Sequence, residues 1–117
     1  MAAPNIVSPA TITLKQLSTT VGTAALTLVT CGANKAIKLG TLFAANVHGT
    51  NAGDITIRVS DGTATHAVCS TVSVPADASL VVVDRHSPLY LEEGDSVEAI
   101  ASATGTINVV GSYEEIA

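Results

Sequence analysis

The clearest pattern along the chain is the strict alternation of apolar and polar side chains in Ile-Thr-Ile-Arg-Val-Ser, residues 55–60. Such alternation predicts a β-strand with one buried face and one solvated face. The dipeptide Asp61-Gly62 follows directly and is a strong hairpin-turn motif between alternating segments. We therefore expect a hairpin whose second strand covers residues 65–74.

Similar short segments occur along the rest of the chain, with turn residues every eight to twelve positions, and we count about eight strands. Besides the hairpin, β-type segments occur over residues 11–14, 24–29, 36–39, 41–47, 80–83, 89–91, 97–103 and 106–116, and not every segment is counted as a separate strand. Gly40 interrupts an apolar run and suggests a bulge or bend. The wholly apolar residues 80–83 predict a strand buried on both sides. Residues 97–116 predict a closing hairpin around Thr104-Gly105.

This spacing predicts an all-β fold, an antiparallel β-sandwich of jelly-roll type. Pro4 and Pro9 predict an extended N-terminal arm over residues 1–10, because proline lacks a backbone donor. The length of 117 residues fits one domain, which we place at residues 11–117.

Composition limits the classes of partner. Charged residues make up 13% of the chain, against about 25% in an average domain. Either Ser, Thr and Asn keep the surface soluble, or part of the surface is covered by partners. The net charge of −5 argues against nucleic acid, and no apolar run is long enough to span a membrane.

Charge is uneven along the chain. Residues 1–60 hold four Lys or Arg and one Asp, a net charge of +3, whereas residues 61–117 hold one Arg and nine acidic residues, a net charge of −8. The favoured interpretation is that interleaved strands mix these charges within one molecule. The alternative is electrostatic complementarity between neighbouring copies.

Residues 1–10 show neither a basic start nor a continuous apolar stretch, so we expect a protein made in a cytoplasm. Cys31 and Cys69 are then expected to be reduced. Buried packing is the favoured role for both, and a disulfide between them stays an open alternative.

No group of residues predicts a catalytic, cofactor or metal site. Asp84, His86 and Ser87 offer the residue types of a hydrolase triad, but neighbours in a turn diverge. His48, His66 and His86 are widely separated, and Asp54, Asp61 and Asp95 do not form a calcium loop. The pairs Glu92-Glu93 and Glu114-Glu115 cannot form dyads because adjacent strand residues face opposite ways. They are expected to be solvated charges, the second pair also guarding an edge strand.

Several stretches resemble small virion proteins of tailed bacteriophages. They are residues 53–62 (GDITIRVSDG), 72–76 (VSVPA), 80–84 (LVVVD), 89–96 (LYLEEGDS) and 111–116 (GSYEEI), within a resemblance that covers most of residues 35–117.

The resemblance implies a particle component on the capsid exterior. It implies a decoration (cement) protein that forms homo-oligomers, with a trimer favoured, and binds the major capsid protein, aided by the terminal arm. The same resemblance allows a tail or head–tail connector component. A host-surface binding module is a further alternative, disfavoured by the shortage of aromatic and Arg side chains. An enzyme is the least favoured class.

Overall fold

The computed structural model describes residues 11–117, and the arm expected over residues 1–10 lies outside them. The described residues form nine β-strands: β1 (Ile12–Val21), β2 (Leu26–Thr30), β3 (Ala36–Asn46), β4 (Gly53–Ser60), β5 (Thr65–Val74), β6 (Ser79–Val83), β7 (Leu89–Leu91), β8 (Ser96–Ala101) and β9 (Ile107–Ile116). No helix in this part of the chain is long and apolar enough to cross a membrane.

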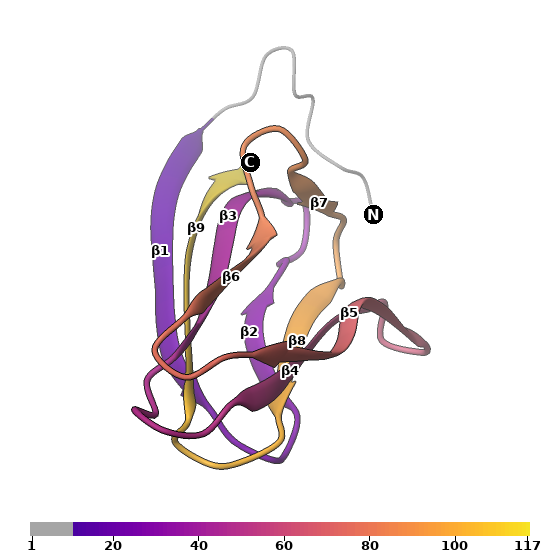
Figure 1. The fold of residues 1–117 in the computed structure, drawn as a ribbon. Helices are drawn as coiled ribbons and strands as arrows, with labels where there is room; N and C mark the ends of the chain where they lie inside the picture. Colours follow the sequence, from indigo (N-terminus) through magenta and orange to yellow (C-terminus); the bar gives the residue numbers. More distant parts are fainter. Residues whose placement is uncertain (1–10) are drawn as a thin grey trace.

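The strands form two sheets that pack face to face (Figure 1). Sheet A has the order β1-β9-β3-β6, with β7 also pairing with β3, and sheet B has the order β2-β8-β4-β5. All pairings are antiparallel. The first strand pairs with the last, β2 with β8, β3 with β6 and β4 with β5, so the chain resembles one long hairpin folded over on itself. This is the jelly-roll arrangement, which confirms the predicted antiparallel sandwich.

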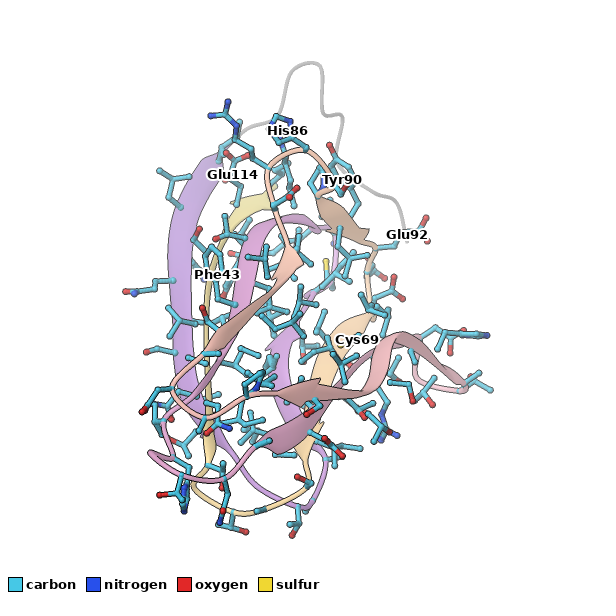
Figure 2. The ribbon with its side chains drawn as sticks, in the orientation of Figure 1. Phe43, Cys69, His86, Tyr90, Glu92 and Glu114 are labelled. Atoms are coloured by element: carbon cyan, nitrogen blue, oxygen red, sulfur yellow. The ribbon has the colours of Figure 1, made fainter. Side chains whose placement is uncertain are left out.

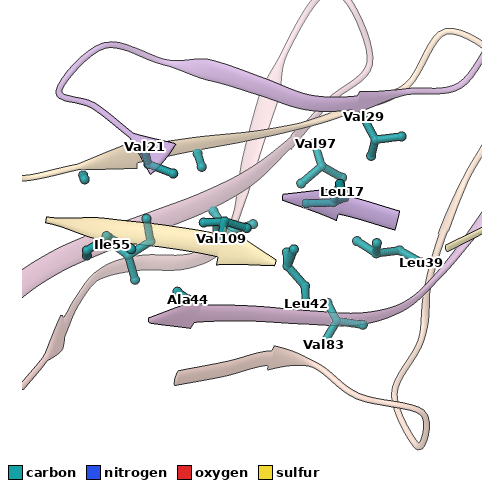
Figure 3. Close-up of a cluster of buried hydrophobic side chains, with 14 of the residues drawn as sticks. Leu17, Val21, Val29, Leu39, Leu42, Ala44, Ile55, Val83, Val97 and Val109 are labelled. Carbon is teal, nitrogen blue, oxygen red and sulfur yellow. The ribbon is translucent and has the colours of Figure 1, made fainter. Parts of the chain in front are cut away.

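The core lies between the sheets and consists of aliphatic side chains, drawn in Figure 3. The residues fully shielded from solvent include Ile37, Leu39 and Leu42 of β3, Ile55 and Ile57 of β4, Val97 of β8 and Val109 of β9. Period-two alternation brings these residues to the inner faces, since successive side chains of a strand point in opposite directions.

The local predictions around β4 are confirmed. Ile55 and Ile57 are completely buried, whereas the remaining residues of the alternating segment, 56 and 58–60, are half-buried. Gly62 has a φ of 92°, and the Asp61 carboxylate accepts hydrogen bonds from the amides of Thr63 and Ala64 at 2.9 and 2.8 Å. These bonds favour the ionised carboxylate and lower the pKa of Asp61. Gly40 lies at a register shift between β3 and β9, as expected for a bulge.

Three predictions about strands were wrong. Residues 97–116 do not form a hairpin, because β8 belongs to sheet B and β9 to sheet A. Residues 80–83 are not buried on both sides. β6 is the last strand in the order β1-β9-β3-β6, and one of its valines, Val81, is 53% exposed. The first strand extends to Val21, well beyond residue 14, because its Ser and Thr side chains alternate with the buried Leu17 and Val21.

The uneven charge along the sequence is mixed in space, as the favoured interpretation predicted. Arg58 binds Glu98 at 2.8 Å, and Lys15 and Lys35 both bind Glu115 at 3.3 Å. Each of these ion pairs joins the basic first half of the sequence to the acidic second half.

Candidate interaction surface

The outer face of sheet A, the face turned away from sheet B, carries an exposed apolar row. Phe43 of β3 is the cross-strand partner of both Val110 of β9 and Val81 of β6. The three side chains are 38%, 39% and 53% exposed, respectively. Three adjacent strands therefore present contiguous apolar surface to solvent, an arrangement that usually marks an interface.

A second row on this face combines apolar and charged side chains. Leu14, Glu114, Lys38 and Tyr90 are successive cross-strand partners on β1, β9, β3 and β7. Leu14 is 76% exposed and Tyr90 is 62% exposed. Figure 2 labels Phe43, Glu114 and Tyr90, so both rows can be located on the ribbon. Between the rows, the hydroxyls of Thr41 and Ser112 lie 2.8 Å apart in a hydrogen bond.

A hollow of about 310 Å³ opens beside the second row. Its walls include Leu14, Thr41 and Ser112 from the strands and Arg85 from the β6–β7 loop. Lys15 and Lys38 also line it, so three of the five cationic side chains of this acidic chain gather here. Glu114 adds one carboxylate to the lining, so the hollow offers an excess of positive charge, hydroxyl groups and an apolar wall.

Glu115 lies on the inner side of the same sheet end and has a structural role. Its side chain is 17% exposed and binds both Lys15 and Lys35. Burial raises the pKa of this carboxyl, but the hydrogen bonds from Lys35 and Lys15 and their charges outweigh that effect, so the pKa is lowered from its ordinary 4.5. The expectation that Glu114-Glu115 guards an edge strand was wrong, because β9 lies between β1 and β3.

We expect Glu115→Gln to lower the free energy of unfolding by about 1 kcal/mol at pH 7, the upper end for partly exposed ion pairs. A carboxyl whose pKa is lowered by folding stabilises the protein above its unfolded-state pKa, and this stabilisation is lost as the pH falls through the folded-state pKa. The difference between variant and parent should therefore shrink as the pH drops below about 4.5. Urea unfolding across this range tests the prediction, with Glu114→Gln on the opposite face as the control. Equal losses in both variants would contradict it.

Several of the residues singled out by type hold turns. The Asp84 carboxylate accepts hydrogen bonds from the backbone amides of His86 and Ser87 at 2.9 and 3.1 Å, so it holds the turn. Nδ1 of His48 accepts from the amides of Thr50 and Asn51 at 3.1 and 3.0 Å.

Side chains of the turn at residues 92–95 also accept hydrogen bonds from backbone amides. Asp95 accepts from the amide of Glu92 at 3.0 Å, and Glu93 accepts from the amide of Asn34 at 2.6 Å. Over residues 11–117, no three His, Cys, Asp or Glu side chains lie together as a group that could hold a metal ion.

The two cysteines are free thiols in separate environments. Cys31 is buried, and its thiol donates to the carbonyl of Lys35 at 3.2 Å. Burial, with the negative charges of Asp95, Glu115 and Glu93, raises the pKa of this thiol. Cys69 is half-buried in β5. Buried packing is therefore confirmed for Cys31 and only partly for Cys69.

Sequence reasoning missed the outer face of sheet A. An apolar run such as residues 80–83 shows no alternation in its letters, although Val81 is exposed and Val83 is buried. Phe43 lies between two buried residues, Leu42 and Ala44, so its outward direction depends on strand geometry alone.

Comparisons with known proteins agree with the fold. No family model matches the chain, and no curated protein sequence matches it. A subunit described as a Bacillus endospore appendage of a family of disulfide-linked pili aligns over 91% of this chain and 88% of its own, at 16% identity and a TM-score of 0.50.

Two viral structures align more loosely. A pentameric capsid protein from metagenomic phage sequences aligns over 84% of this chain and 59% of its own, at 19% identity and a TM-score of 0.44. A structure of infectious bursal disease virus, Gx strain, aligns over 93% of this chain and 33% of its own, at 14% identity and a TM-score of 0.47. Of these three, the appendage subunit reaches a TM-score of 0.50, and at its level of identity the likeness is one of fold.

Proposed function

We propose that this chain is a structural component of a bacteriophage particle: a capsid decoration protein that self-associates and binds the shell of the major capsid protein from outside. The observation that carries the proposal is the exposed apolar row of Phe43, Val81 and Val110 on the outer face of sheet A. A solvated face of a sandwich normally presents polar side chains, so this row is suited to a protein partner.

The fold and the use of polar groups support a structural role. Jelly rolls are a frequent architecture of viral capsid domains. The side chains of Asp61, Asp84 and His48 bind backbone amides of their own turns, which stabilises the loops. The proposed protein is made in the host cytoplasm and forms a homo-oligomer, with the trimer implied by the phage resemblance.

The hollow beside Leu14 supports a second candidate function, a host-surface binding module. Its volume of about 310 Å³ falls at the lower end of typical small-molecule sites. Jelly rolls also occur as lectin domains. A glycan array probed with the intact protein tests this candidate, since selective binding to one class of sugar would favour it over decoration.

The copy number of this chain per purified particle tests the main proposal. Quantitative mass spectrometry against the major shell subunit gives this number directly. A count similar to that of the shell subunit supports decoration of the capsid, and a handful of copies would place the protein in the tail or connector instead. Complete absence from the particle would overturn the virion proposal.

A matched pair of edge-strand variants tests the surface. Val81→Asp on β6 should weaken attachment to undecorated particles at least tenfold, because it places an unpaired charge in an apolar contact. Val68→Asp on β5, a valine that is 41% exposed on sheet B, is the control and should bind normally. Binding measured by co-sedimentation should persist in molar salt, since apolar burial is not screened. Equal weakening by both substitutions would contradict the assignment to sheet A.

A further inference from the structure

Strand β1 forms an unbroken edge of sheet A, at the left margin of Figure 1. Within residues 11–117 it pairs with β9 alone, through ten consecutive residue pairs without any register shift. A strand with one free side presents a row of backbone N–H and C=O groups, which is a template for another strand.

The other edge strands are short or interrupted, and β7, which pairs with β3 alone, has three residues. Strand β2 has five residues and a register shift against β8, and β6 has five residues and a shift against β3. Strand β5 is longer, but it has two shifts against β4 and a positive φ of 52° at Thr71.

Short strands and bulges protect an edge from pairing with other chains. Strand β1 has neither, and it contains no proline. Its one charge, Lys15, is already bound to Glu115.

The hydrogen bonds at the start of β1 determine which residues face the free side. Thr11 exchanges two backbone hydrogen bonds with Ala117, at 3.1 and 2.9 Å. In an antiparallel ladder this pattern repeats every second residue. Odd-numbered residues of β1 therefore bond to β9, and the free N–H and C=O groups belong to residues 12, 14, 16, 18 and 20.

We propose that β1 pairs antiparallel with β1 of a second copy, joining the two A sheets into one continuous sheet. This inference rests on the proposed self-association and identifies the interface. Among the described edge strands of this chain, only β1 offers ten residues without a register shift. A second copy of β1 is therefore the strand that can pair with β1 along its full length. A two-fold contact of this kind uses the same strand in both copies.

The free groups determine the register of the pairing. Only even-numbered residues can exchange both hydrogen bonds, and pairing that uses all five of them places Gln16 opposite Gln16 of the second copy. Leu14 then faces Ser18, and Ile12 faces Thr20. Lys15 lies opposite Leu17, so no like charges meet across the contact.

This two-fold contact is separate from the three-fold contact that the phage resemblance implies. Both can operate in one closed assembly of dihedral symmetry. A covalent cross-link across the two-fold contact gives a dimer on a denaturing gel whether or not the three-fold contact also forms. The test is therefore independent of the size of the assembly.

The first experiment places a cysteine on the two-fold axis of the full-length protein carrying Cys69→Ser. Gln16→Cys should form a disulfide-linked dimer under mild oxidation, because Cα atoms of a hydrogen-bonded pair lie about 5.5 Å apart, within disulfide range. Ser112→Cys is the matched control, on the same face of β9 and directly opposite Gln16 within the molecule. A Gln16→Cys variant that stays monomeric on a non-reducing gel, or a control that cross-links equally well, would overturn the proposal.

The second experiment removes one donor from the edge. Ser18→Pro deletes a backbone N–H that points away from β9, so circular dichroism of the folded chain should be unchanged. Sedimentation should show loss of the two-fold contact and half the parent's assembled mass, whereas Ser18→Ala should match the parent. If the parent assembles and Ser18→Pro assembles equally well, the β1 interface is wrong while the proposed function stands. Absence of the chain from particles would remove the proposed function without affecting the cross-link.

Discussion

Asn46→Asp is expected to destabilise the protein by about 3–5 kcal/mol, the usual penalty for an uncompensated buried charge. Asn46 is 2% exposed, and its amide nitrogen donates to the carbonyls of Asn51 and Val74, both at 2.9 Å. Its side-chain oxygen accepts from the amide of His48 at 2.8 Å. Aspartate keeps the shape but replaces two donors by an anionic oxygen that faces two carbonyl oxygens, which leaves both carbonyls without this partner.

Urea unfolding at pH 7 measures this loss. Asn108→Asp is the matched control, because Oδ1 of Asn108 accepts from the Thr20 hydroxyl at 2.9 Å and aspartate preserves that acceptor. Burial raises the pKa of an aspartate at position 46, so its destabilising effect should decrease as the pH falls and the group is protonated in the folded state. Similar unfolding midpoints for both variants at pH 7 would show that the Asn46 contacts contribute little.

Gly111→Ala should cost about 3 kcal/mol, at the upper end for overpacking of a core. Gly111 lies in β9 between Leu17 of β1 and Leu42 of β3. A methyl group there would lie 2.5 Å from the carbonyl oxygen of Thr41 and 3.1 Å from Cδ1 of Leu42. The first contact is with backbone, so β3 and β9 would have to separate next to the bulge at Gly40.

Thermal unfolding should detect this change as a fall in Tm of roughly 10–20 °C. Gly22→Ala is the control, because the nearest atom to its added methyl is the Thr104 hydroxyl oxygen at 3.8 Å. Its Tm should stay close to that of the parent. An unchanged Tm for Gly111→Ala would mean that β3 and β9 adjust their spacing freely.

Short-range chemistry explains which features could be predicted from the sequence. The alternation over residues 55–60 places Ile55 and Ile57 in the core whatever the strand order, because side-chain direction depends only on backbone period. Asp61-Gly62 forms its turn from its own backbone preferences and hydrogen bonds. The all-β class and the sandwich architecture follow from repeating such segments along the chain.

The candidate surface depends on which strands become neighbours, and that is decided by long-range packing. Val81 belongs to an apolar run, yet it is exposed because β6 is the last strand of the order β1-β9-β3-β6 and turns this side chain to the outer face of sheet A. Phe43 meets Val110 across a ladder that joins residues far apart in the sequence.

The sequence by itself determined the strand-forming segments, the local turns and the all-β class of this protein, since these depend on neighbouring residues. Tertiary structure alone decided that β8 and β9 enter different sheets, that Glu115 is held by two lysines and that β1, among residues 11–117, pairs with β9 alone. The physical reason is that backbone pairing and core burial are satisfied jointly by distant segments, so neither appears in any local pattern.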